Sequence, residues 1–353
     1  ADLLAGDIQE IKSTLARVAS VSDMAGRYMV GTRKEFGVVI AAFLETYLGT
    51  DELRKPFGGR TTILDDLDVW LQAPGRKRYR FLHAPAGRGK SALLAHWLAR
   101  ITARAEVHVA FVSISPRFES TSSEVVFGVL ASQLAQIHGE DLPLAQESGA
   151  DYRRLVGAYL RRAPTGGRPL LLVVDGLDES PEWLLRADVI PPVPPPHLRV
   201  VCSARTGIAG SVESYLQLLN WNKEICLLDE LGSLSHAGFS DVLSSLGEPL
   251  PPLVKNAEFV DRVYALTGGD PLLVTLYAEA LRPYGDEPPV ISSAADLVGL
   301  QSGYDGFFKS LFMRQYEDQE AIWRAGGDRA PALPVGPLLC VLAVALGPLA
   351  SDD

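Results

Sequence analysis

A glycine-rich segment near residue 90 has the residue types and spacing that bind phosphate groups. It reads Ala84-Pro85-Ala86-Gly87-Arg88-Gly89-Lys90-Ser91. Gly87 and Gly89 give the backbone the freedom to turn its N–H groups toward one small concavity. A helix that begins near Lys90 would add the positive end of its dipole. We expect Lys90 to reach the β- and γ-phosphates of a nucleotide and the Ser91 hydroxyl to ligate Mg²⁺.

One position departs from the pattern GxxxxGK[ST], because Ala84 stands where the first glycine is usual. Alanine is tolerated there if its φ angle is negative. The alternative interpretation is a glycine-rich turn without a ligand. The residues expected to contact nucleotide are Pro85, Ala86, Gly87, Arg88, Gly89, Lys90, Ser91 and Ala92.

Acidic residues follow a second apolar run, Leu170 to Val174, in the sequence Asp175-Gly176-Leu177-Asp178-Glu179. An acid at the carboxyl end of a buried parallel strand lies beside the phosphate loop, where open α/β sheets bind ligands. Asp175 is therefore expected to hold Mg²⁺ through water. Asp178 and Glu179 are expected to orient the attacking water.

A third apolar run, Leu198 to Cys202, ends in Ser203-Ala204-Arg205. Arg205 at such a strand end could sense the γ-phosphate, with Ser203 assisting. A solvated surface cation is the alternative.

The elements that must position these residues alternate between short apolar runs and longer amphipathic segments. This alternation predicts an α/β fold with a doubly wound parallel sheet. Helical patterns ahead of the sheet, at Asp7–Val18, Glu35–Leu48 and after Thr61, predict accessory helices, and those after Asp229 predict a small all-α unit. Expected strands are Arg80–His83, Val107–Ile114, Leu170–Val174, Leu198–Cys202 and Glu224–Leu228; expected helices are Ser91–Arg104, Ser123–His138, Tyr152–Arg162, Pro181–Ala187, Ser235–Leu246, Lys255–Leu266, Pro271–Leu281 and Tyr304–Trp323.

The three motifs together resemble the STAND class of P-loop NTPases, which includes the NACHT and NB-ARC domains. Phe57-Gly58-Gly59-Arg60 is similar to the segment of that class on the adenine side, so the resemblance implies nucleotide contacts from Phe57, Gly59 and Arg60. Gly269-Asp270-Pro271 resembles the GxP motif of its helical domain, and implies that Pro271 lies over the adenine and helps to hold ADP. Without the resemblance, this segment would be a helix stop followed by a proline-initiated helix.

The resemblance also implies a domain order. Residues 1–55 would be an N-terminal helical accessory segment, residues 56–229 the P-loop α/β core, and residues 230–330 a helical lid. Residues 331–353 would begin a truncated winged-helix domain, since Pro334–Leu349 looks like its first helix.

Composition limits the classes of partner. The 33 Lys and Arg against 43 Asp and Glu give a net charge of −10, which disfavours binding to nucleic acid or an acidic membrane surface. Three cysteines without a CxxC pair indicate a reducing, cytoplasmic location. The uncharged stretch Pro331–Ser351 is interrupted by prolines and leaves an apolar run of roughly ten residues, short of the ~20 that a bilayer requires.

The resemblance implies an ATP-binding and slowly hydrolysing signal-transduction switch with ATP, ADP and Mg²⁺ as ligands. The ADP and ATP states of this switch would control homo-oligomer assembly and a fused effector. The effector and sensor domains would lie outside this sequence. The amino-acid composition favours a role in bacterial antiviral defence or programmed cell death. A DNA-acting AAA+ ATPase of the replication-initiator or clamp-loader kind is the alternative, and a non-hydrolysing scaffold is a third. GTP is disfavoured, because Asn222-Lys223-Glu224-Ile225 lacks the acid of a guanine-reading motif.

Overall fold

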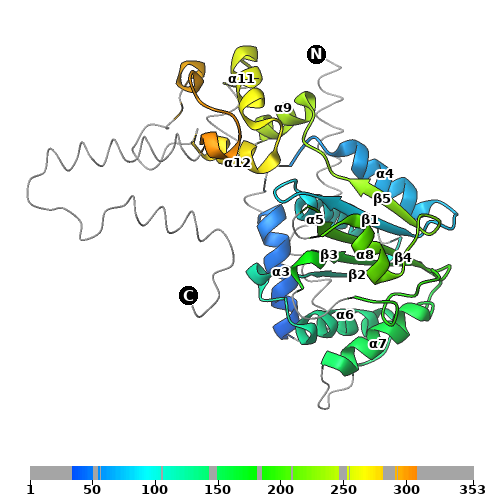
Figure 1. Ribbon diagram of the computed structural model, residues 1–353. Coiled ribbons are helices and arrows are strands. Elements are labelled where there is room, and N and C mark those ends of the chain that lie inside the picture. Colours follow the sequence, from blue (N-terminus) through cyan, green and yellow to red (C-terminus); the bar gives the residue numbers. More distant parts are fainter. Residues whose placement is uncertain are drawn as a thin grey trace, which may run out of the picture.

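A five-stranded parallel sheet forms the centre of the larger part of the chain (Figure 1). The structure is a computed structural model, and it describes residues 34–50, 55, 57–104, 106–142, 149–180, 185–207, 210–245, 253, 255–280, 291 and 293–307. The strand order is β2-β3-β4-β1-β5. The strands are β1 (Tyr79–Ala84), β2 (His108–Ser113), β3 (Leu170–Asp175), β4 (Leu198–Arg205) and β5 (Cys226–Glu230). This sheet confirms the predicted α/β fold of a P-loop NTPase.

The register of the sheet brings the ends of four strands to one edge. Ala84 at the end of β1 pairs with Arg205 at the end of β4. Ser113 at the end of β2 pairs with Asp175 at the end of β3. Because all these pairs are parallel, the loops that follow the four strands leave the sheet on the same side.

Helices pack against the sheet, and its central strands are largely apolar. All six residues of β3 are buried, as expected for a central strand covered on both faces. The helices of this unit are α3 (Lys34–Leu48), α4 (Thr61–Gln72), α5 (Lys90–Thr102), α6 (Ser123–Ile137), α7 (Gly149–Arg161) and α8 (Val212–Leu219). The short 3-10 turns η1 (Pro116–Phe118) and η2 (Leu177–Glu179) follow β2 and β3.

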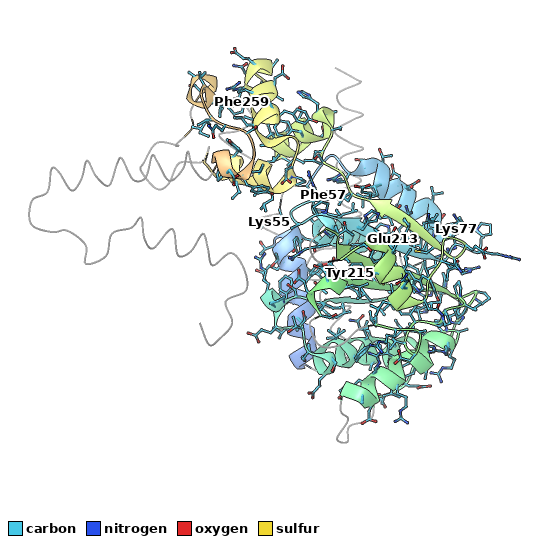
Figure 2. All side chains as sticks on the ribbon, viewed as in Figure 1. Lys55, Phe57, Lys77, Glu213, Tyr215 and Phe259 are labelled. Atoms are coloured by element: carbon cyan, nitrogen blue, oxygen red, sulfur yellow. The ribbon has the colours of Figure 1, made fainter. Side chains whose placement is uncertain are left out.

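A second group of helices follows β5 and has a buried core of its own. It consists of α9 (His236–Ser245), α11 (Ala257–Thr267), α12 (Pro271–Ala280) and the turn η3 (Ala294–Leu297). One buried cluster extends from Val39 to Leu231, and the other from Leu234 to Phe307. Figure 2 shows the side chains in these two groups, with Phe259 in the helical one and Phe57 near their junction. The exact domain boundaries stay predictions.

Helix α3 packs into the same core as the sheet. Its Phe43 ring lies 4.7 Å from Phe111 of β2 and 5.7 Å from Phe118 of η1, measured between ring centroids. Phe43 and Leu44 are fully buried. This part of the N-terminal segment therefore belongs physically to the wall of the α/β unit.

Several predicted elements differ from the structure in their bounds, and two of the differences have a clear physical cause. The last strand begins at Cys226 rather than Glu224, because the Asn222 side chain accepts hydrogen bonds from the backbone N–H groups of Glu224 (2.9 Å) and Ile225 (3.3 Å) and holds them in a turn. The expected helix Pro181–Ala187 is wrong in its described residues, 185–187, which are not helical. There the chain turns to bury Val189 and Ile190 completely.

Other expectations fall outside the described residues. These are the helix Asp7–Val18, the part of Tyr304–Trp323 beyond Phe307, and residues 331–353. Among the residues that the structure describes, no helix combines the length and apolarity that spanning a bilayer requires.

Candidate active site

The glycine-rich segment forms a loop between β1 and α5. Gly87 and Gly89 both have left-handed φ angles, 79° and 83°, which explains why glycine occupies these positions. Ala84 is the last residue of β1 and is not among the described residues with positive φ, so the departure from the usual pattern causes no strain. Helix α5 begins at Lys90, with its free N–H groups at the loop.

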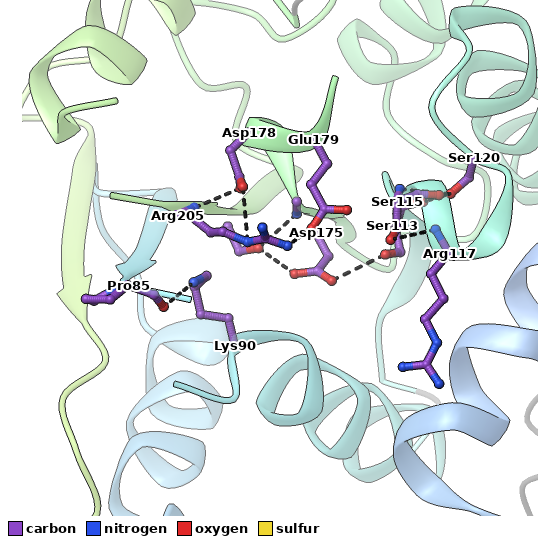
Figure 3. A network of polar contacts seen from close by, with 12 residues as sticks. Pro85, Lys90, Ser113, Ser115, Arg117, Ser120, Asp175, Asp178, Glu179 and Arg205 are labelled. Atoms are coloured by element: carbon purple, nitrogen blue, oxygen red, sulfur yellow. Dashed lines mark hydrogen bonds and ion pairs between the residues drawn. The ribbon is translucent and has the colours of Figure 1, made fainter. Parts of the chain in front are cut away.

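The Lys90 ammonium group bonds to the first residues of this loop (Figure 3). Its Nζ donates hydrogen bonds to the carbonyl oxygens of Ala84 (2.8 Å) and Pro85 (3.1 Å). Burial lowers the pKa of Lys90, and the carboxylates of Asp178 and Asp175 act against this shift. Phosphate oxygens could take over the contacts that the two carbonyls now make.

Asp175 is a buried carboxylate surrounded by hydroxyl groups. The Ser203 hydroxyl donates to it at 2.5 Å and the Ser113 hydroxyl at 3.3 Å, and the Ser91 hydroxyl also bonds to it. Burial raises the pKa of Asp175, and hydrogen bonds from Ser203, Ser91 and Ser113 partly offset the shift.

This donor set fits Mg²⁺. The ion prefers oxygen ligands and is usually held by one or two carboxylates together with water and substrate phosphates. Asp175 and the Ser91 hydroxyl supply such oxygens, and a divalent cation would compensate the buried negative charge. In the described part of the chain, no three His, Cys, Asp or Glu side chains gather into a metal site of their own.

The turn η2 holds the two further acids next to the end of β4. Asp178 accepts a hydrogen bond from the backbone N–H of Arg205 (2.8 Å), and its side chain is only 4% exposed. The Arg205 guanidinium forms an ion pair with Glu179, whose side chain is 19% exposed. Burial raises the pKa of Glu179. A hydrogen bond from Ser115 and the positive charge of Arg205 lower the same pKa and partly offset this shift. Of the two acids, Glu179 is therefore the one placed to meet a water molecule.

A cavity of about 550 Å³ contains most of these groups. This volume lies within the usual range of small-molecule sites, roughly 300 to 1,000 Å³. The predicted site residues that line it are Phe57, Arg60, Gly87, Arg88, Gly89, Lys90, Ser91, Ala92, Asp175, Asp178, Glu179, Arg205 and Pro271.

Three predicted contact residues, Pro85, Ala86 and Gly59, do not line the cavity. Pro85 and Ala86 are exposed, and Pro85 takes part through its carbonyl group, which accepts from Lys90. Gly59 packs against Gly238 of α9, where a Cβ atom would lie 2.6 Å from the Gly238 Cα. The glycine at position 59 is thus explained by close backbone packing, with a φ of 67°.

Several residues of the cavity are not found by the sequence motifs. Ser113, Ser115 and Arg117 follow or end β2, and the rule that polar residues end strands at the ligand edge could have found them. Tyr47 of α3 has no such signal, since it precedes the phosphate loop by about forty positions. Its hydroxyl is hydrogen-bonded to Ser91, and burial raises its pKa.

The helical unit touches the phosphate loop directly. Arg88 of the loop forms an ion pair with Asp270 (3.4 Å) just before α12, and also donates a hydrogen bond to Ser233. Arg60 donates to the carbonyl oxygens of Arg88 (3.2 Å) and Gly232 (2.8 Å). The first turn of α12 therefore lies over the loop that would hold phosphate.

A comparison with protein families agrees with this geometry. Residues 56–189 match the family model described as AAA ATPase domain, and this segment contains the phosphate loop, Asp175, Asp178 and Glu179. The protein is a P-loop ATPase. The match covers less than half of the chain and ends before Arg205 and the helical unit.

The chain is also similar to several solved structures, including the following three. Cdc6p from Pyrobaculum aerophilum is 15% identical, with a TM-score of 0.36, over 73% of this chain and 62% of that chain. The Signal Transduction ATPase with Numerous Domains (STAND) protein with a tetratricopeptide repeat sensor from Pyrococcus horikoshii is 17% identical, with a TM-score of 0.41, over 80% of this chain and 39% of that chain. Drosophila ORC bound to DNA is 15% identical, with a TM-score of 0.42, over 83% of this chain and 75% of that chain.

Similarity at this level carries no information on the ATPase's biological role. The chain spans less than two thirds of the first two of these chains. No curated protein sequence matches the chain.

Proposed function

We propose that this ATPase is a nucleotide-controlled switch whose helical unit closes over bound nucleotide. In this proposal the ADP state is closed, and the ATP state favours self-assembly and activation of a fused effector, as the resemblance to STAND proteins implies. Bacterial antiviral defence or programmed cell death is the biological setting that we propose. The observation that supports the switch most directly is the ion pair between Arg88 of the phosphate loop and Asp270 at the start of α12.

The roles of the cavity residues follow from their positions. Lys90 would bind the β- and γ-phosphates, and Ser91 with Asp175 would hold Mg²⁺. The bound ion would supply charge neutralisation for the transferring phosphoryl group. Pro271 and Phe57 line the other part of the cavity, together with Arg60, and are proposed to face the base.

The ion pair between Arg205 and Glu179 suggests how the switch could sense the γ-phosphate. The Arg205 guanidinium pairs with Glu179 and Asp178. A γ-phosphate would compete for the guanidinium, because phosphate binds arginine through two parallel hydrogen bonds. Glu179 would then be free to accept a hydrogen bond from the attacking water.

The test is the assembly state of the chain as a function of nucleotide. We expect a small species with ADP and a larger one with Mg²⁺ and a non-hydrolysable ATP analogue, measured by light scattering coupled to size-exclusion chromatography. Lys90→Ala should abolish nucleotide binding and assembly, whereas Lys223→Ala, at an exposed turn, should change neither. The same size with both nucleotides would argue against the switch.

Adding duplex DNA separates the switch from the DNA-acting alternative. Assembly that needs no DNA supports the signalling switch. Assembly or ATP turnover that appears only with DNA would favour the replication-initiator class instead.

A further inference from the structure

Arg117 is a cation of the nucleotide cavity that none of the sequence motifs includes. It lies in η1, directly after β2, and lines the same cavity as Lys90, Asp175 and Glu179. Figure 3 shows Arg117 and Lys90 on opposite sides of Asp175. Lys90, which is proposed to bind phosphate, and Arg117 therefore approach the cavity from different walls.

The backbone around Arg117 is held firmly against the sheet. The Ser120 hydroxyl donates to the carbonyl oxygen of Ser113 (2.6 Å) and accepts from the backbone N–H of Ser115 (3.1 Å). The neighbouring Phe118 is buried against Phe43 of α3. Because Ser113 pairs with Asp175 in the sheet, this network fixes the position of Arg117 relative to the acids of the site.

The turn is also closed by an uncommon conformation. Glu119 has a φ of 54°, and only one other non-glycine residue in the described part of the chain, Asn220, has a positive φ. This conformation carries a cost of about 1 kcal/mol for a residue with a Cβ atom. The unfavourable backbone conformation of Glu119 therefore lies in the same turn as Arg117.

The other arginines and the lysine of the phosphate loop already have protein partners. Lys90 bonds to two carbonyl groups, Arg88 pairs with Asp270, and Arg205 pairs with Asp178 and Glu179. Among the described residues, the Arg117 guanidinium has no carboxylate partner, and it lies 5.8 Å from the centroid of the Phe118 ring. Its N–H groups are available to an anion that enters the cavity.

The position of β2 shows which end of a nucleotide Arg117 would meet. Ser113, the last residue of β2, pairs with Asp175 in the sheet, and its hydroxyl donates to the Asp175 carboxylate (3.3 Å). Asp175 is the residue proposed to hold Mg²⁺, and Arg117 follows β2 and lines the same cavity as Ser91 and Glu179. This position favours a contact at the γ-phosphate end of the cavity.

We propose that Arg117 is a catalytic residue that contacts the γ-phosphate of ATP bound in the same cavity. This inference rests on the proposed function only in requiring that nucleotide binds there. In the hydrolysis, the water oxygen bonds to the γ-phosphorus and its proton passes to the Glu179 carboxylate. The bond between the γ-phosphorus and the β–γ bridging oxygen breaks, and ADP leaves with that oxygen and the electron pair of the bond. Arg117 donates hydrogen bonds to the non-bridging γ-oxygens, on which charge is spread in the transition state.

Nucleotide affinity and turnover of Arg117→Ala and Arg117→Lys test the assignment. We expect Arg117→Ala to weaken binding of a non-hydrolysable ATP analogue by about 10-fold to 100-fold while ADP affinity stays unchanged. The kcat should fall as well, and Arg117→Lys should recover part of both losses. Arg154→Ala, which changes an exposed arginine of α7, is the matched control.

Equal weakening of ADP and ATP-analogue binding, or no change in either, would overturn the assignment. If the unchanged chain binds neither nucleotide, the proposed function fails together with it. If the unchanged chain binds both and Arg117→Ala behaves like the control, only this inference fails.

Mixing two variants with reduced or abolished turnover shows whether Arg117 acts on the nucleotide bound by its own chain. Arg117→Ala and Lys90→Ala are combined, and phosphate release is measured. No recovery of turnover supports a contact within one chain. Recovered turnover would place Arg117 against the nucleotide of a neighbouring copy and overturn the proposal as stated.

Discussion

Replacing Asp270 with asparagine removes one charge from the contact between the helical unit and the phosphate loop. Asp270 is 7% exposed, and its carboxylate lies 3.4 Å from the Arg88 guanidinium. It also accepts hydrogen bonds from the backbone N–H groups of Leu272 (3.0 Å) and Leu273 (3.2 Å), and from the Tyr304 hydroxyl (2.8 Å). Asparagine caps a helix as well as aspartate does. The variant therefore isolates the effect of the ion pair.

The size of the effect follows from the geometry. Two unit charges 3.4 Å apart attract each other by about 5 kcal/mol at an effective dielectric constant of 20. Removing both groups from water cancels much of this attraction, since the side chains of Arg88 and Asp270 are 24% and 10% exposed. We expect a net coupling of about 1 to 3 kcal/mol. If closure of the helical unit retains ADP, Asp270→Asn should release ADP about 5-fold to 150-fold faster.

A double-mutant cycle with Arg88→Met and Asp270→Asn measures the coupling by chemical denaturation without nucleotide. Release of a fluorescent ADP analogue from Asp270→Asn is then followed by stopped flow. Asp261→Asn is the matched control, because its pair with His236 lies on the exposed surface of the same helical unit. Additive stabilities, within about 0.5 kcal/mol, together with unchanged ADP release would refute the reasoning.

Two further predictions concern the acids of the site. Glu179→Gln should leave ATP affinity unchanged and slow phosphate release by about 100-fold or more, because the amide cannot accept the proton of the attacking water; a normal rate would transfer this role to Asp178. Asp175→Asn should change the pH dependence of stability in the nucleotide-free protein. Burial raises the pKa of Asp175 in the folded state, so the folded protein holds this proton at pH values where the unfolded chain, with a pKa of about 3.9, has lost it. Stability should therefore fall as the pH rises from about 3.9 through the raised value, and this component should be missing in Asp175→Asn; identical pH profiles of the two melting temperatures would contradict the assignment.

Much of the phosphate loop could be predicted because its requirements are local. Gly87 and Gly89 need left-handed backbone angles within one turn between a strand and a helix, and the sequence provides both glycines and both flanks. Asp175 and Arg205 could be placed by a general rule, because the carboxyl ends of parallel strands share an edge. The rule needed no knowledge of which strands are neighbours.

The bounds and types of some elements were predicted wrongly. In these places a local hydrogen bond, or the burial of apolar side chains, determines the conformation rather than the hydrophobic periodicity. The Asn222 side chain delays the start of β5, and burial of Val189 and Ile190 replaces part of an expected helix by a turn. For Gly59, the nucleotide contact implied by its motif stays a prediction, and a close backbone contact with Gly238 accounts for the glycine at this position. That contact joins residues far apart in the chain, so no sequence window contains both.

The sequence by itself therefore determined the fold class, the phosphate loop and the acids at the ends of the strands, because each depends on periodicity or on a few adjacent residues. Only the tertiary structure placed Tyr47 of α3 in the same cavity as Ser91. The same is true of the ion pair between Arg88 and Asp270. These contacts depend on which helix faces pack together and in what orientation. An apolar stripe identifies the buried face of a helix, but it does not identify the element that packs against this face.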